Sequence, residues 1–378
     1  MKRRGYSRRR GNVLVITAFL MTVLMAFLAF AVDLGYLFSV RTELQRTADS
    51  AAIAAAWDLI DKDGQAGMES ATGLACTATA TASEFAALNT VGSATPGLAG
   101  DDVVVGYMSN PSNPGNPLIA TPTGSLPNAV KVRVQRTSNQ NGQVNLFFAR
   151  VIGFDEASLD AEATAAFVST FSGFQAPADG SNLNILPFAL DEDTWNGLTT
   201  NGTDTWTYNP NSKTVSAGAD GVKEVNLYPQ GTGSPGNRGT VDIGSSNNST
   251  ADIARQITSG ISASDLAYLG GSILFDDTGV LHLNGDTGIS AGVKDELASI
   301  IGKPRLIPIF RSVVGPGNNA DYTIVKFVGV RILDVKLTGS MSSKRLTIQP
   351  CNVVAKGGIY QQGGATTEFV YSPVRLVR

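Results

Sequence analysis

The chain has 378 residues, and only 16% of them are charged, well below the roughly 25% of an average soluble domain. Gly, Thr, Ser and Asn fill the positions that Lys and Glu usually occupy, which favours an exported, strand-rich protein over a cytosolic helical enzyme. The net charge of the whole chain is −3, and the six basic residues among residues 1–10 contribute +6, so the rest of the chain has a net charge of −9. This acidic balance excludes a basic surface for nucleic acid.

A membrane span follows the basic segment. Val13–Val32 is a run of 20 residues without charge, Gly or Pro, and at about 1.5 Å per residue it crosses a hydrocarbon layer of roughly 30 Å. The basic residues before it predict a cytoplasmic N-terminus and a body outside the cytoplasm. These topology residues are Lys2, Arg3, Arg4, Arg8, Arg9 and Arg10.

A cleaved signal peptide is the alternative. Its apolar region is typically about 7–15 residues long and ends in an A-x-A-like site. Ala29–Ala31 has that form, but the apolar helical pattern continues through it. We therefore expect a retained anchor in contact with membrane lipid, in the inner membrane, with the C-terminal body in the periplasm.

A helical stalk continues from the span. Between Asp33 and Ile60 the only helix breaker is Gly35, and apolar residues recur about every 3.5 positions. Span and stalk together predict one helix of about 48 residues, on the order of 70 Å long. Small residues favour close approach of another helix or sheet, although alanine also simply propagates a helix. The expected helix-interface residues are Leu37, Leu44, Ala48, Ala51, Ala52 and Ala55.

The pattern after the stalk predicts an α+β protein: a long transmembrane and stalk helix, a small α+β domain, then a mainly-β distal domain. The expected divisions are a cytoplasmic basic segment at 1–11, a transmembrane helix at 12–33, an alanine-rich stalk at 34–62, a pilin-like module at 63–170, a linker at 171–182 and a β-rich extracytoplasmic domain at 183–378.

Within the module we expect a helix over residues 68–89 and strands at Val103–Val105, Ala129–Val134 and Leu159–Val168, with a short apolar helix at Asn145–Ile152. The side of the first helix that is expected to be buried holds Leu74, Ala75, Ala78, Ala82, Phe85 and Leu88.

The distal domain is expected to hold two helices, Thr250–Ser259 and Ser290–Ile301, among many strands. Tyr322–Leu337 is too long for one strand, so we expect a bend near Gly329. The strands are expected near Ile185–Ala189, Thr205–Tyr208, Lys223–Leu227, Thr240–Ile243, Ser272–Phe275, Arg305–Phe310, Tyr322–Leu337, Arg345–Gln349 and Thr366–Val370.

Cys76 and Cys351 are the only cysteines. A disulfide is permitted outside the cytoplasm, and it would tie the module to the distal domain. Two cysteines so far apart in sequence can equally stay separate, so both states remain open.

Several short sequence motifs resemble catalytic or ligand-binding sites. Gly231–Gly236 matches G-x-G-x-x-G, but a strand rather than a helix is expected after it, which favours a hairpin loop over a nucleotide site. Asp277–Gly279 and Asp286–Gly288 resemble aspartic-protease loops, but nine residues of separation cannot supply two lobes. Both fit hairpin turns. We expect no catalytic residue, cofactor, metal or small-molecule substrate.

Three further features are weighed in the same way. The alternation of His282 with Leu281 and Leu283 indicates a strand residue. A calcium site at Asp276, Asp277 and Asp286 is not favoured, because these residues lack the ligand spacing expected of such a site. Trp195 and Trp206 are expected to fill a core rather than to bind a sugar.

The N-terminal residues resemble a known family. Arg9–Val13, Asp33–Tyr36 and Leu44–Ala56 together resemble the N-terminal module of TadG-like proteins of the Tad (tight adherence) machinery, which assembles Flp-type pili. A looser likeness, reaching to about residue 170, rests on Leu146–Gly153 and Leu159–Ala166. The resemblance implies a pilus-assembly component whose partners are other assembly or pseudopilin subunits.

Two departures from related patterns limit this reading. Processed pilins carry Glu at the fifth residue after the cleavage glycine, where this chain has Ile16, so an uncleaved anchor is expected. Asp242–Ser246 has Gly244 where the metal site of a von Willebrand A domain needs a Ser. The leading hypothesis is thus a non-enzymatic, membrane-anchored assembly component. The alternatives are a surface-exposed adhesin and, less favoured, an envelope hydrolase.

Overall fold

The computed structural model describes residues 11–60, 70–113, 115–228, 238–246, 249–286, 288–315, 317–360 and 367–377. Lys2, Arg3, Arg4, Arg8, Arg9, Arg10 and the glycine-rich loop at 231–236 lie outside these ranges. No structural statement therefore concerns them.

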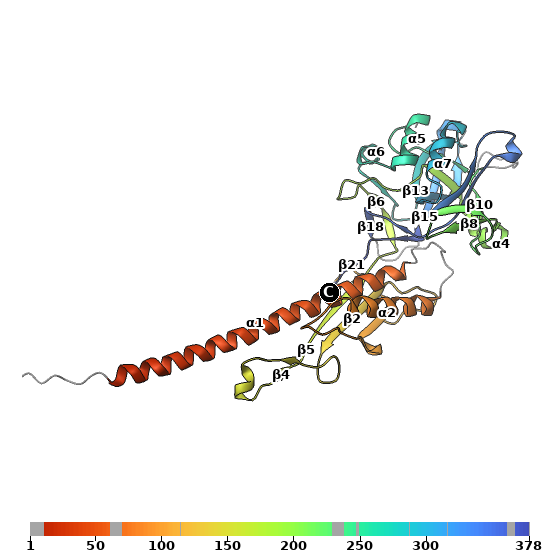
Figure 1. The fold of residues 1–378 in the computed structure, drawn as a ribbon. Coiled ribbons are helices and arrows are strands. Elements are labelled where there is room, and N and C mark those ends of the chain that lie inside the picture. Colours follow the sequence, from red (N-terminus) through yellow and green to blue (C-terminus); the bar gives the residue numbers. More distant parts are fainter. Residues whose placement is uncertain are drawn as a thin grey trace, which may run out of the picture.

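The first helix, α1 (Gly11–Leu59), is continuous through the predicted span and stalk (Figure 1). Its large apolar side chains are mostly exposed from Val13 to Phe38, whereas those from Val40 onward pack inside the protein. Among the described residues, one helix is long and apolar enough to cross a membrane, and it is α1. The expected single helix is confirmed, and its two halves have different surroundings.

The second half of α1 packs against helix α2 (Ala71–Ala87) and against a four-stranded antiparallel sheet, in the order β1-β2-β5-β21. Figure 1 shows this module around the C-terminal half of α1, with the β-rich domain beyond it. The remaining elements of the module are η1 (Gly100–Asp102), β1 (Val103–Gly106), β2 (Ala129–Arg136), β3 (Val144–Asn145), η2 (Ala149–Ile152), β4 (Glu156–Ala157), β5 (Leu159–Ala166) and β21 (Arg375–Leu376).

Helix α2 lies within the expected range 68–89 and begins at Ala71, because the side chain of Ser70 caps it by accepting a hydrogen bond from the amide of Gly73. Fewer residues of α2 are buried than predicted, and the buried ones are Leu74, Ala78, Ala82 and Ala86. Phe85 and Leu88, which were expected on that side, are 39% and 71% exposed. The expectation failed at these two positions because the side of α2 that faces α1 carries mostly alanine at intervals of four residues. These small side chains let the two helices approach more closely than Phe85 and Leu88 would.

The predicted helix Asn145–Ile152 is wrong in its first half. Asn145 ends β3, and only Ala149–Ile152 is helical, as the 3₁₀ turn η2. The β3 and β4 strands pair antiparallel, so the segment between them forms the tip of a hairpin.

The distal part of the chain is mainly β, as expected, and its largest sheet closes on itself. Hydrogen-bonded pairings run from β15 through β13, β11, β7 and β14 and back to β15, with β10, β16 and β19 attached outside this ring. The strands of this sheet are β7 (Phe188–Asp191), β10 (Val225–Asn226), β11 (Arg238–Val241), β13 (Leu281–Asp286), β14 (Pro304–Val314), β15 (Ala320–Lys336), β16 (Arg345–Pro350) and β19 (Thr367–Glu368).

Smaller elements complete this domain. The helices are α3 (Glu192–Asn196), α4 (Leu198–Asn201), α5 (Thr250–Ser259), α6 (Ala263–Tyr268) and α7 (Lys294–Ser299), with 3₁₀ turns η3 (Ala291–Val293), η4 (Gly317–Asn319) and η5 (Met341–Ser343). The remaining strands are β6 (Phe171–Gln175), β8 (Trp206–Asn209), β9 (Thr214–Ala217), β12 (Ser272–Leu274), β17 (Val353–Val354), β18 (Gly358–Tyr360) and β20 (Val370–Tyr371).

The expected bend near Gly329 is wrong, because β15 is one strand of 17 residues. Its pairing with β16 shifts register between Ile332 and Asp334 instead. Gly329 serves a close approach: a Cβ there would lie 2.2 Å from the carbonyl oxygen of Cys351. A bulge lets a long strand curve without breaking.

Two short strands join the module to the distal domain. Phe171–Gln175, inside the segment predicted as a linker, is the strand β6 and pairs with β12 and β18. At the other end of the sequence, β21 returns to the module and pairs with β5. The domain boundaries themselves stay a prediction.

Candidate functional site

The most distinctive arrangement of the module lies where the uncharged run of α1 ends. Asp33, only 3% exposed, accepts hydrogen bonds from three successive backbone amides of the hairpin tip. Its Oδ1 lies 2.8 Å from the nitrogen of Phe147, and its Oδ2 lies 3.0 Å from that of Phe148 and 2.7 Å from that of Ala149. Several amide hydrogen bonds compensate a buried carboxylate for its loss of hydration. Asp33 therefore fixes the hairpin tip to α1.

Further contacts hold the tip in shape. The rings of Tyr36 and Phe147 meet edge to face with centroids 5.1 Å apart. The guanidinium of Arg150 donates to the carbonyl oxygen of Leu146 at 3.1 and 2.9 Å. Gly153 closes the turn with φ of 90°, a conformation that favours glycine. The tip is therefore a built turn rather than a loose loop.

This turn presents large apolar side chains to the outside. We call Phe147, Phe148, Val151, Ile152 and Phe154 the apolar tip. Val151 is 84% exposed, Ile152 73% and Phe154 64%. In Figure 1 the hairpin, near the label β4, lies beside α1 on the side of the module toward the N-terminus. Exposed apolar groups gathered in this way mark an interaction surface.

The predicted helix-interface residues lie on one side of α1. Leu44, Ala48, Ala51, Ala52 and Ala55 are completely buried, and Leu37 packs against the same cluster. Their neighbours are α2 and strands β2 and β5 of the same chain. The structure thus uses these small residues inside the molecule.

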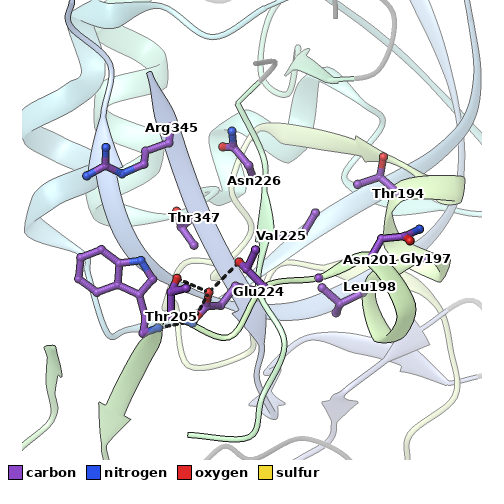
Figure 2. Close-up of a pocket in the computed structure, with 13 residues that line it drawn as sticks. Thr194, Gly197, Leu198, Asn201, Thr205, Glu224, Val225, Asn226, Arg345 and Thr347 are labelled. Carbon is purple, nitrogen blue, oxygen red and sulfur yellow. Dashed lines mark hydrogen bonds between the residues drawn. The ribbon is translucent and has the colours of Figure 1, made fainter. Parts of the chain in front are cut away.

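The distal domain contains a groove of about 640 Å³ beside α4 and β10. Figure 2 shows Arg345 and Thr347 across the groove from Thr194 and Asn201, with Glu224 between them. Most lining side chains are uncharged: Thr194, Leu198, Asn201, Thr203, Thr205, Trp206, Val225, Asn226 and Thr347.

The two charged groups of the groove are already engaged within the protein. Glu224 is 1% exposed and accepts hydrogen bonds from the Thr203 and Thr205 hydroxyls and from the Thr205 and Trp206 amides (Figure 2). Arg345 forms an ion pair with Asp334. A carboxylate with this many donors has a structural role, since it holds the 203–206 segment against β10.

The other candidate residues fall into structural positions. The Asp276 carboxylate accepts from the Thr278 hydroxyl and from two turn amides, and the hydroxyl bond first of all holds the pKa of Asp276 below its ordinary value. His282 is an exposed strand residue, 3.0 Å from Asp321. Trp195 is buried and donates to Glu368 at 2.7 Å. In the described ranges, no three His, Cys, Asp or Glu side chains form a cluster that could hold a metal ion.

The two cysteines are not joined in the structure. Cys76 is exposed on α2, whereas Cys351 is completely buried just after β16.

The apolar tip was not recognised from the sequence. Phe147 and Phe148 fell inside the predicted short apolar helix Asn145–Ile152, for which no surface role was expected. The available signal was Asp33, a single acidic residue directly after 20 uncharged ones. A charge in that position needs partners, and the structure supplies them from 114 residues farther along the chain.

The comparisons with known proteins concern the same part of the chain. A family model described as Flp pilus-assembly TadE/G-like matches residues 11–58, and a second, described as Tad-like Flp pilus-assembly, matches residues 54–165. No curated protein and no solved structure matches the chain. Apart from Arg9, Arg10 and Ala166, the residues that carried the resemblance lie inside the matched ranges, as do Asp33 and the hairpin tip that it binds. Over residues 11–165 the chain is therefore similar to the TadE/G-like and Tad-like Flp pilus-assembly families.

Proposed function

We propose that the protein is a non-enzymatic component of Tad/Flp pilus assembly, held by α1 in the inner membrane. The observation that carries this proposal is the family match over residues 11–165, which begins on α1, a helix that is long and apolar enough to cross a membrane. The matched range covers the anchor and the packed module together.

The orientation is supported by the charges that flank α1. Six basic residues precede the uncharged run within residues 1–10, and such residues stay on the cytoplasmic side. Residues beyond Asp33 then lie in the periplasm. Because α1 contains no Glu at position 16, the anchor is permanent, unlike that of a processed pilin.

The extracytoplasmic domains would contact other assembly or pseudopilin subunits. Support comes from the burial of the alanine side of α1 inside the module, which leaves the outer faces of the module and the distal domain as the surfaces for partners. The saturated Glu224 and the engaged Arg345 favour binding or scaffolding over catalysis in the distal groove.

A deletion and complementation experiment tests this function. Cells lacking the gene should lose Flp-type pili in electron micrographs, and the full chain should restore them. The variant Leu24→Arg should not restore them, because a charge in the middle of the span costs roughly 3 kcal/mol of insertion, whereas the matched variant Leu24→Ile should. Unchanged piliation in the deletion strain would overturn the proposal.

The surface-adhesin alternative predicts a different location. Antibodies against residues 183–378 should bind only after the outer membrane is opened if the protein acts in assembly. Binding to intact cells would favour the adhesin.

A further inference from the structure

We propose that the apolar tip inserts into the interfacial layer of the same membrane that α1 crosses, so that the module is held at two points. This inference rests on the proposed membrane anchoring. Its ligand is the lipid surface itself, at the depth where acyl chains meet headgroups.

The height of the tip along α1 is fixed by named contacts. The three amide hydrogen bonds to Asp33 place Phe147, Phe148 and Ala149 beside the residue at which the uncharged run ends. Tyr36, one turn farther along α1, packs on Phe147. The tip is thus level with the end of the span and continuous with its lipid-facing surface.

The exposed fractions of the apolar side chains along α1 indicate the same boundary between its membrane-spanning part and its packed part. Phe38 is still 66% exposed, whereas Val40 and Leu44 are completely buried. The change from exposed to buried apolar side chains occurs within a few residues of Asp33. Any bilayer that covers Val13–Val32 therefore reaches the level of the hairpin tip.

The composition of the tip suits a bilayer interface. Two Phe rings, Val151, Ile152 and Phe154 supply apolar area, and all five side chains are about half exposed or more. Arg150 lies among them, exposed, and a cation in this position pairs with lipid phosphate. The acidic residues Asp155 and Glu156 follow at the base of the hairpin, on the side toward water.

A second contact changes what the anchor can do. One transmembrane helix alone leaves the body free to rotate about the helix axis and to tilt. A turn that inserts roughly 5–10 Å into the interface restrains the tilt, because tilting would change the depth of the tip. The orientation of the module relative to the membrane is then set by Asp33 and the tip.

The test uses the full chain in lipid nanodiscs made of phosphatidylethanolamine and phosphatidylglycerol. In a Cys76→Ser background, single cysteines at Leu24, Ile152 or Tyr268 carry an environment-sensitive nitrobenzoxadiazole label. These positions represent the span, the tip and an exposed site of the distal domain, and all three side chains are more than half exposed. Cys351 is buried, so the Cys76→Ser protein alone gives the labelling background.

Quenching separates the two proposals. We expect the Ile152 label to be quenched by lipids with a nitroxide near the headgroup and to be shielded from iodide, while the Tyr268 label is quenched by iodide. A Leu24 label quenched by deep nitroxides together with an Ile152 label that behaves like Tyr268 would overturn the tip insertion and leave the anchor intact.

Two other outcomes would also overturn the inference. A shielded Ile152 label that no nitroxide lipid quenches would mean that protein, not lipid, covers the tip. A Leu24 label open to iodide would remove the anchor on which the inference rests. Because Ile152 is 73% exposed, its substitution disturbs few contacts within the protein.

Discussion

At the scale of single residues, buried carboxylates in this protein hold backbone segments in place. Asp33 binds three amides of the hairpin tip, and Glu224 binds the amides and hydroxyls of the 203–206 segment. In both cases the acid and the segment that it binds belong to different elements. The geometry fits a structural role, because every donor is supplied by the protein itself.

Replacement of Asp33 by Asn should loosen the hairpin tip. One of the two oxygens becomes an NH₂ group that faces amide donors, so the amides of Phe147, Phe148 and Ala149 should exchange hydrogen faster by roughly tenfold. Hydrogen exchange of the detergent-solubilised chain measures this. The matched control Asp101→Asn changes an exposed carboxylate of the same module and should leave these amides unaffected.

Replacement of Glu224 by Gln should lower the free energy of unfolding of the distal domain by about 1–3 kcal/mol, because buried donors lose their acceptor. Denaturation followed by tryptophan fluorescence measures the loss in a Trp57→Phe background, where Trp195 and Trp206 are the remaining tryptophans. The exposed Asp277 serves as control, and Asp277→Asn should change stability by less than about 0.5 kcal/mol. Equal stability of the Glu224→Gln and unmodified chains would contradict the structural role.

At the scale of elements, periodicity predicted which residues of α1 are buried but not what covers them. The 3.5-residue repeat identified Leu44, Ala48, Ala51 and Ala55, because a helix buries residues on one side. It could not show that the partners are α2 and the sheet of the same chain. Long-range pairing of this kind leaves no periodic signal in either segment.

Ala52→Leu should destabilise the module by about 1–3 kcal/mol, since the added methyl groups meet a surface with no free space. Ala54→Leu, on the half-buried side of the same turn, should have a much smaller effect. Thermal unfolding of the two variants in the same detergent compares them directly. If both variants melt alike, the alanine side of α1 is not the tightly packed one.

The hairpin tip shows where local reading fails. Asn145–Ile152 was predicted to be a helix because it is short and apolar. Whether it is exposed depends on its contacts with α1, which is distant in sequence, and the segment's own sequence does not reveal those contacts. Similarly, the length of β15 suggested a bend at Gly329. The strand is continuous, its pairing with β16 shifts register after Ile332, and Gly329 accommodates the backbone at Cys351.

At the scale of the whole molecule, the strand β21, which follows the β-rich domain in sequence, lies in the module with α1. The strand β21 pairs with β5, and the amide of Val377 donates to the carbonyl of Thr164 at 2.9 Å. Near it, the amide of Ser372 donates to the carbonyl of Val168 at 2.8 Å. A two-residue strand has no recognisable pattern, so this return could not be predicted, although the order of helix, module and β-rich domain could.

Removal of residues 374–378 should open the outer edge of β5. The amides and carbonyls that face β21 would then meet water, so the amides of Thr164 and Ala166 should exchange more rapidly, whereas that of Ala165 faces β2. Hydrogen exchange of the truncated chain tests this. Arg375→Ala keeps the backbone pairing and should preserve the protection.

The central claim is that α1 crosses the membrane once and leaves residues beyond Asp33 outside the cytoplasm. The exposed thiol of Cys76 on α2 tests it most directly, because Cys351 is buried and does not compete for reagent. A membrane-impermeant maleimide added to intact spheroplasts should label Cys76, and a cysteine placed by Ser7→Cys in a Cys76→Ser chain should react only after lysis. Labelling of Ser7→Cys in intact spheroplasts, or of Cys76 only after lysis, would contradict the account.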